Sequence, residues 1–136
     1  MNEMNKSNMN LVDLPYEILL IILNKLDNMN VLYSLFNLGN QRLDELVQDE
    51  TFTKILNFVM KTSTEDICSI DELLLDRFCV DILPRIDSNV RSLIVEGRFM
   101  ERILHATTFS NLTQLKVFNF DEKTLSEYFS GRIIFY

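Results

Sequence analysis

The side chains best suited to metal binding or nucleophilic catalysis are few in this chain of 136 residues: two cysteines and one histidine. Cys68 and Cys79 lie eleven residues apart, and His105 lies far beyond them. Structural zinc sites use closely spaced pairs of cysteine or histidine ligands. The sequence therefore predicts no metal site, and two free thiols in apolar surroundings favour a reducing compartment.

Catalysis would require Cys79 as a nucleophile, with His105 brought close to it by the fold. Cys79 stands between two apolar residues in a predicted amphipathic helix, a setting that favours a thiol buried in a core. The chain has only three glycines and no glycine-rich phosphate loop, and it has no paired-carboxylate motif. We therefore expect neither an enzyme nor a cofactor.

The charge of the chain also excludes a class of partner. The net charge is −7, from 20 acidic and 13 basic residues. A general nucleic-acid surface needs clustered lysines and arginines. The basic residues here are scattered, and only Arg85 with Arg91 and Arg98 with Arg102 come near to forming pairs in the sequence. A helix-turn-helix is the other possibility, but the predicted third helix (QRLDELVQDE) is acidic. We expect no nucleic-acid partner.

The sequence shows no sign of a signal peptide or a membrane span. The first ten residues are polar and predict a disordered lead-in without an apolar signal core. The longest uninterrupted apolar run, Ile18 to Leu23, is six residues long, far short of a membrane-spanning helix. We expect a soluble protein of the cytoplasm or nucleus with no membrane partner.

Three helices with short turns are predicted between residues 11 and 49. The first runs from Pro15 to about Leu26, the second from about Asn30 to Gly39, and the third begins at the N-cap Asn40. The first helix is apolar on nearly every side: Leu20 and Ile21 project outside its main apolar arc, and only Asn24 and Lys25 are clearly polar. Such a helix has to be buried nearly all round, which three short helices do not achieve alone. We therefore expect a partner protein to cover its second side.

Residues 50–86 are predicted to form a helical linker or cap. The run from Phe52 to Met60 fits a helix or a strand, and residues 61–66 are polar enough for a loop. Ser69 lies three residues before Glu72, the spacing of a capping box, and is expected to open a helix that ends at Pro84.

Residues 87–136 show a repeated strand–helix pattern. Alternating apolar positions predict two strands, VRSLIV and LTQLKV, offset by 22 residues, with a helix around Phe99 to Leu104 between them. A helix at 123–129 and the strand-like RIIFY fit a third copy that is cut off. A repeat of this length is similar to a leucine-rich repeat, although the polar residue after each strand, Gly97 or Asn119, comes one place early.

The segment from about Leu11 to Asp49 resembles the F-box. The resemblance rests on the LPxE start (Leu14 to Glu17), on the apolar spacing of the first helix, and on Leu38-x-Asn40-x-Arg42-Leu43 at the third. Many F-boxes have Cys and Trp in the third helix, whereas this chain has Asn40 and Leu43 and no tryptophan. The implied fold is α/β: an N-terminal three-helix F-box-like module followed by a short, truncated leucine-rich-repeat-like solenoid fragment.

The resemblance implies a substrate-recognition adaptor of an SCF-type cullin–RING ubiquitin ligase, with a Skp-type adaptor and the cullin scaffold as partners and an unknown protein as substrate. The alternative is a leucine-rich-repeat interaction protein with no ubiquitin-ligase role. The expected adaptor-binding residues are Leu14, Pro15, Glu17, Ile18, Leu19, Ile22, Leu23, Leu32, Leu35, Leu38 and Leu43. The candidates for lining the substrate surface are Arg91, Ile94, Lys116 and Phe118.

Overall fold

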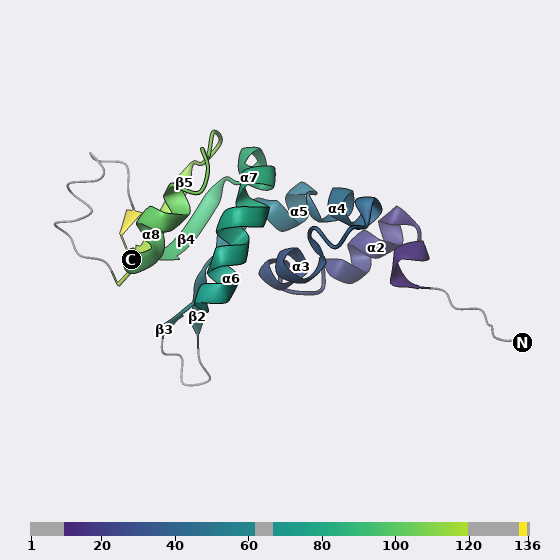
Figure 1. Ribbon diagram of the computed structural model, residues 1–136, viewed down its shortest axis with the longest axis horizontal. Helices are drawn as coiled ribbons and strands as arrows, with labels where there is room; N and C mark the ends of the chain where they lie inside the picture. Colours follow the sequence, from purple (N-terminus) through teal and green to yellow (C-terminus); the bar gives the residue numbers. More distant parts are fainter. Residues whose placement is uncertain (1–9, 62–66, 120–133, 136) are drawn as a thin grey trace, which may run out of the picture.

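The fold is mixed helix and strand, as the α/β prediction requires. The computed structural model describes residues 10–61, 67–119 and 134–135 (Figure 1). Short helices make up residues 11–53, and a four-stranded parallel sheet, a two-stranded sheet and further helices follow. The predicted lead-in lies outside the described residues except for Asn10, and the predicted helix at 123–129 lies wholly outside them.

The helical unit contains the 3₁₀ turn η1 (Leu11–Asp13) and the helices α2 (Tyr16–Leu23), α3 (Asn28–Leu35) and α4 (Gln41–Val47). As predicted, Asn40 is the N-cap of α4, and its side chain accepts a hydrogen bond from the Leu43 N–H at 3.0 Å. The first helix ends at Leu23 rather than Leu26, and α3 starts two residues earlier than expected. The reason is that the turn at 24–26 and the N-cap Asp27 already lead into the next helix.

The linking segment 50–86 is not only helical, which corrects the prediction. After α5 (Glu50–Thr53) the chain forms the strands β1 (Ile55–Asn57), β2 (Val59–Lys61) and β3 (Ile67–Ser69), of which β2 and β3 pair antiparallel. The undecided run at 52–60 is therefore mostly strand. Helix α6 (Glu72–Arg77) then continues into the π-helical turn η2 (Phe78–Ile82), α7 (Leu83–Ile86) and the 3₁₀ turn η3 (Asp87–Asn89).

Two predicted helix boundaries in this segment are wrong. Ser69 does not cap a helix, because it pairs with Val59 in the β2–β3 hairpin. The N-cap of α6 is Asp71, whose carboxylate accepts a hydrogen bond from the Leu73 N–H at 2.8 Å. Pro84 does not end the helical run either, since it lies in the first turn of α7, where its missing N–H costs nothing.

The main sheet has four parallel strands in the order β1-β4-β5-β6. Its members after β1 are β4 (Ser92–Glu96), β5 (Gln114–Phe118) and β6 (Ile134–Phe135), and α8 (Gly97–Leu104) follows β4. Ser92 pairs in register with Gln114, so the predicted offset of 22 residues is confirmed for these two strands. Parallel neighbours need a crossover, and α8 provides it.

One face of the sheet contributes to the hydrophobic core. Leu56, Leu93 and Leu115 occupy equivalent positions on three neighbouring strands, and all three are buried. Phe58, two residues beyond Leu56 and therefore on the same side, packs edge-on against Phe78 of η2 with ring centroids 5.3 Å apart. Helix α8 contacts β4 and β5 and covers this face. The other face is here called the open face, because its described residues Ile55 and Asn57 are exposed and Ile94 is only half-buried.

Arg77 of α6 joins the helical unit to the rest of the chain. Its guanidinium donates hydrogen bonds to the carbonyl oxygens of Tyr33 (2.9 Å) and Phe36, and it lies over the Tyr33 ring at 5.4 Å. These carbonyls belong to the last turn of α3 and to its C-cap, where no intrahelical donor is left for them. A charged donor from another element therefore satisfies the end of α3.

Replacing Arg77 with methionine is expected to lower the free energy of unfolding by about 2–3 kcal/mol. The aliphatic volume stays, but two part-buried carbonyls lose a charged donor, a loss of about 1.5–3 kcal/mol in other proteins. Urea unfolding monitored by circular dichroism measures the change. Arg98→Met, at an exposed arginine of α8, is the control and is expected to change the value by less than about 0.5 kcal/mol. Equal losses in both variants would refute the role given to Arg77.

The helices of the described residues are short. The longest described ones, such as α2 and α8, have eight residues, and within the described ranges no helix combines the length and the apolar character that crossing a bilayer requires.

A candidate protein-docking surface

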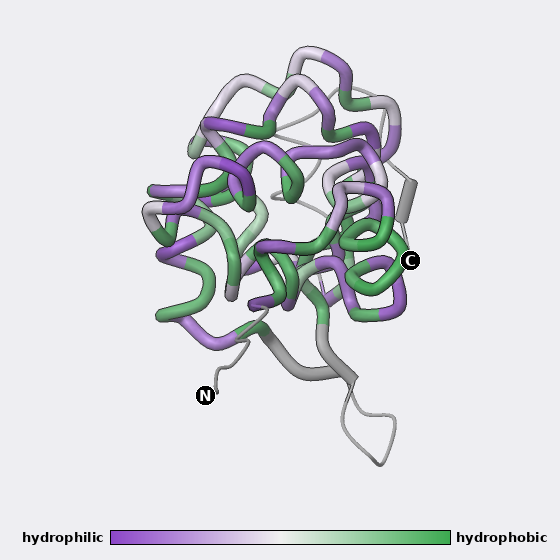
Figure 2. Tube along the Cα trace, turned by 90° about the vertical axis from the view of Figure 1, so that its right-hand side faces the viewer, coloured by the Kyte–Doolittle hydropathy of each residue, from purple (hydrophilic) through white to green (hydrophobic). Residues whose placement is uncertain are grey.

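Helix α2 carries an exposed apolar face, here called the α2 strip and made of Ile18, Ile21 and Ile22. Residues three and four apart share one side of a helix, so the three side chains lie together. Their exposed fractions are 43%, 58% and 39%. Leu11 before the helix and Leu26 after it are also exposed. Figure 2 views the molecule from the end of the fold that carries α2 and shows hydrophobic stretches, coloured green, alternating with hydrophilic ones along the trace.

The opposite side of α2 belongs to the internal core. Leu19 and Leu23 are buried there with Leu32, Phe36 and Leu46 of the following segments. The apolar run thus serves two surfaces: one side packs inside this chain, and the other is left uncovered by the described residues.

This division separates the expected adaptor-binding residues. The side chains that remain accessible are Pro15, Glu17, Ile18, Ile22 and Leu38, with Leu14 and Leu35 half-buried. The buried ones are Leu19, Leu23, Leu32 and Leu43. We correct the expectation for these four, because a side chain with almost no accessible surface has none left to offer a partner. Ile21 was not among the expected residues, although its projection outside the main arc was the available signal.

The chain entering α2 is held in place by helix α4. The Arg42 guanidinium donates hydrogen bonds to the carbonyl oxygens of Val12 and Leu14. In η1, the Asn10 N–H also donates to the Asp13 carboxylate at 3.1 Å. These contacts fix the Leu14–Pro15 turn, so the start of the α2 strip has a defined position before any partner arrives.

Tyr16 and Asp49 connect the start of α2 with the start of α5. The Tyr16 hydroxyl donates to Asp49 Oδ2 at 3.4 Å, while Asp49 Oδ1 accepts from the Thr51 N–H at 2.9 Å as the N-cap of α5. The Thr51 hydrogen bond is the main reason why the pKa of Asp49 is lowered. Partial desolvation and the Asp49 carboxylate raise the pKa of Tyr16.

The lowered pKa of Asp49 predicts a loss of stability in acid. The ionised carboxylate is favoured in the folded state, so its contribution is complete above the unfolded-state pKa of about 3.9 and disappears as the pH falls through the lower folded-state value. Asp49→Asn keeps an N-cap acceptor and is expected to flatten the pH dependence of the unfolding free energy below about pH 4. Urea unfolding between pH 7 and the acid range measures it, and an unchanged slope in the variant would contradict the assignment.

The second surface is the open face of the main sheet. Ile94 of β4 lies next to Lys116 of β5, and Phe118 lies opposite Glu96. They alternate with the buried residues of the same strands and are half-buried, so they share the open face. Three of the four expected substrate-surface residues are thus brought together.

Arg91 is not part of this group. It precedes β4, and its guanidinium pairs with Glu50 of α5 at 3.7 Å. Its carbonyl oxygen accepts hydrogen bonds from the N–H groups of Thr113 and Gln114 at the start of β5. Arg91 therefore joins the start of β4 to α5. The residues that the sequence reasoning missed are Ile55 and Asn57, which β1 adds to the open face by its pairing with β4.

Among the described residues suited to chemistry, Cys79 and His105 lie in different elements. Cys79 is half-buried in η2, and burial raises the pKa of its thiol, which disfavours the nucleophilic thiolate. His105 is the C-cap of α8. In the described part of the chain, no group of three or more His, Cys, Asp or Glu side chains is arranged to hold a metal ion.

The described residues thus present two separate surfaces, an apolar helix face and an open sheet face. Comparison with known proteins gives no match for this chain among family models, curated proteins or solved structures.

Proposed function

We propose that this chain is a substrate-recognition subunit of an SCF-type cullin–RING ubiquitin ligase. In this proposal the helical unit is an F-box that docks on a Skp-type adaptor, and the sheet region is a leucine-rich-repeat-like fragment that holds a target protein. The observation that carries the proposal is the α2 strip, which begins directly after the LPxE sequence at Leu14 to Glu17. The proposed location is the cytoplasm or nucleus, where this ligase system operates.

The physical support is the unburied apolar surface of α2. Scattered exposed apolar residues are ordinary, but contiguous ones mark interaction sites. The strip is contiguous because Ile21 and Ile22 each lie one helical turn from Ile18. Removing apolar surface from water contributes about 25 cal/mol per Å². The buried half of the same helix fixes the strip in position, so docking requires little ordering of the helix.

The separation of the two surfaces also supports the proposal. In Figure 1, α2 lies at the N-terminal end of the fold and the strands β4 and β5 lie at the other end. The contacts of Arg77 with the end of α3 connect the two regions. A ligase subunit needs one surface for the adaptor and a different one for the target, and this arrangement offers both without competition.

Co-expression with a Skp-type adaptor tests the proposal. The full chain carries an affinity tag, the adaptor carries none, and the purified material is examined by size-exclusion chromatography at low salt. We expect the two proteins to elute together at equal stoichiometry. Separate elution of a folded chain and a folded adaptor would reject the ligase role and favour an interaction protein unconnected with ubiquitination.

A further inference from the structure

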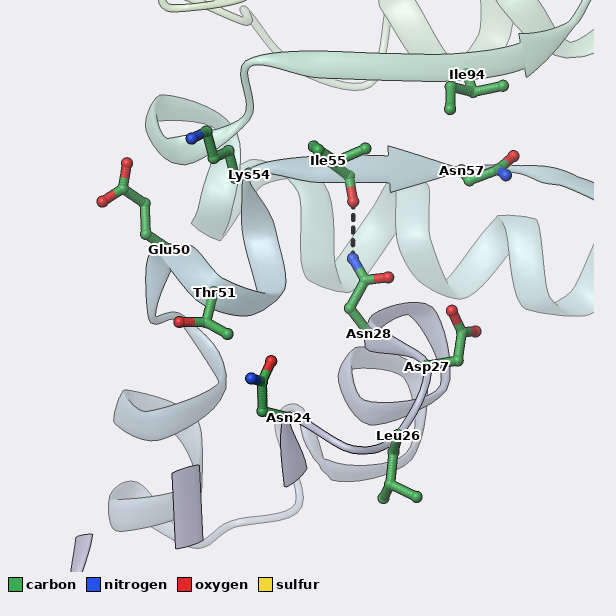
Figure 3. Close-up of a pocket in the computed structure, with 10 residues that line it drawn as sticks. All are labelled: Asn24, Leu26, Asp27, Asn28, Glu50, Thr51, Lys54, Ile55, Asn57 and Ile94. Carbon is green, nitrogen blue, oxygen red and sulfur yellow. Dashed lines mark hydrogen bonds between the residues drawn. The ribbon is translucent and has the colours of Figure 1, made fainter. Parts of the chain in front are cut away.

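A cleft of about 550 Å³ lies where the helical unit meets the sheet. Its walls come from the α2–α3 turn, from α5, and from β1 with the neighbouring residue Ile94 of β4 (Figure 3). The cleft is continuous with the open face of the sheet, because Ile94 lies beside Lys116 in register. An occupant longer than the cleft therefore has a surface to continue on.

Carboxamide groups give this cleft hydrogen-bonding capacity. The Asn28 Nδ2 donates to the carbonyl oxygens of Phe52 (2.9 Å) and Ile55 (2.7 Å), which leaves its Oδ1 as an acceptor. The Asn57 Oδ1 accepts from the Val59 N–H at 2.8 Å, which leaves its Nδ2 as a donor. Asn24 adds a complete carboxamide. Donors and acceptors of this kind match the N–H and C=O groups of a peptide backbone.

Apolar side chains line the same cleft. Leu26 and Ile55 are exposed at 57% and 53%, and Ile94 is half-buried. Figure 3 shows Ile55 and Ile94 on adjacent strands on one side of the cleft and Leu26 on the other. This arrangement suits an aliphatic or aromatic side chain entering between them, since ligand sites combine apolar walls with a few placed polar groups.

The charges of the cleft are separated. Lys54 lies on the α5 side, and Asp27 lies across the cleft near Asn28 (Figure 3). Among the described residues, neither side chain has an ion-pair partner, whereas Glu50 is engaged by Arg91 at 3.7 Å. A bound segment gains from an acidic residue toward Lys54 and a basic residue toward Asp27.

The edge of the sheet limits how a segment binds here. β1 is the outer strand, and an exposed edge generally invites an added strand. The Asn28 side chain already occupies the carbonyl oxygen of Ile55 on that edge. A peptide in this cleft would therefore contact the side chains that line it and would not form a full set of hydrogen bonds with the β1 backbone.

We propose that this cleft binds an extended peptide segment of a target protein, apolar at its centre and flanked by charges of opposite sign. That the protein supplying this segment is a target for ubiquitination rests on the proposed function. The peptide site itself is carried by the three asparagines, the apolar walls and the separated charges of the cleft.

The test uses the full chain without any adaptor. The probe is a fluorescein-labelled library of short capped peptides with apolar central positions and glutamate, lysine or serine at the flanking positions, read by fluorescence polarisation. We expect the bound peptides to combine an apolar centre with one acidic and one basic flank. Thr51→Trp, at an exposed residue of the cleft wall, is expected to weaken the best peptide at least about tenfold, because the large ring fills the space.

Charge reversals give the sharper readout. Lys54→Glu and Asp27→Lys are each expected to weaken the best peptide about fivefold to tenfold, since an attraction becomes a repulsion, and each is expected to favour peptides with the corresponding flank reversed. Glu101→Lys, an exposed charge reversal on α8, is the matched control and is expected to leave binding unchanged. Circular dichroism melts confirm that each variant is folded.

The failure of this inference is distinguishable from failure of the proposed function. Peptides that bind the wild type and the folded Thr51→Trp variant equally, or a library with no binder, would overturn the cleft site while leaving adaptor docking at the α2 strip untouched. Peptide binding that follows the predicted charge pattern in a chain that never binds a Skp-type adaptor would uphold the cleft site and reject the ligase role.

Discussion

Replacing Ile18 and Ile21 together with glutamate is expected to weaken binding to a Skp-type adaptor at least about hundredfold, with the helical circular dichroism signal unchanged. Both side chains are exposed on the α2 strip, so the folded chain keeps its core. In the complex, two carboxylates would have to leave water for an apolar interface, and a penalty of about 1.4 kcal/mol at each position accounts for the hundredfold change. Isothermal titration calorimetry of the full chain measures the affinity.

The chain offers a matched control for this variant. Leu73 of α6 and Val80 of η2 are even more exposed, at 76% and 72%. Helix α6, which continues into η2, lies apart from α2 in Figure 1. Replacing these two residues with glutamate makes the same chemical change outside the α2 strip. The affinity of this variant for the adaptor is expected to stay within about twofold of the wild-type value. If both double variants lost affinity equally, the effect would come from net charge, and the α2 strip would have no special role.

The second large effect is expected at Leu19. Leu19→Ala should lower the free energy of unfolding by about 2–5 kcal/mol, because the side chain is fully buried and its truncation leaves a cavity. A domain of this size is stabilised by only about 5–15 kcal/mol, so the loss is a large share of the total. Ile21→Ala, on the exposed side of the same helix, is expected to change stability by less than about 1 kcal/mol.

Urea unfolding of the two alanine variants, followed by calorimetry with the adaptor, separates the sides of α2. Folded Leu19→Ala molecules should bind with nearly normal affinity, whereas Ile21→Ala should weaken binding without weakening the fold. The reverse pattern, with Leu19 controlling affinity and Ile21 controlling stability, would show that α2 buries its Ile21 side and exposes its Leu19 side.

The strands of the sheet were predictable because their pattern is local. Leu93, Val95, Leu115 and Val117 alternate with more accessible residues, which is the period of a strand with one covered face. The run that contains β1 was left open between helix and strand, because β1 has only three residues and follows directly on a short helix. So short a segment shows neither the helical nor the strand periodicity clearly. Its place in the sheet comes from long-range pairing with β4, which no local pattern contains.

The helix boundaries were predictable only where one capping residue had no competitor. Asn40 was the single good N-cap before α4, and the structure uses it. Ser69 and Asp71 both precede α6, and the capping-box spacing favoured the serine. Pairing of Ser69 in the β2–β3 hairpin removes it from competition, which leaves Asp71 as the cap.

The docking surface was predictable as a helix but not as a set of residues. A run that is apolar on every side reveals that two surfaces must be covered, but not which surface faces inward. The burial of Leu19 and Leu23 in the same hydrophobic core as Leu32, Phe36 and Leu46 decides this, and the side of α2 that enters this core depends on the turns between the helices. Leu19 and Ile18 therefore look equivalent in the sequence and have opposite roles in the fold.

Amide hydrogen exchange of the full chain, alone and with a Skp-type adaptor, tests the central claim most directly. If the adaptor docks through α2, the amide hydrogens from Leu11 to Leu26, where the α2 strip and its exposed flanking leucines lie, become more protected from exchange. Little change is expected across β4 and β5. Protection confined to the sheet strands, or none at adaptor concentrations far above those needed for co-elution, would contradict docking through α2.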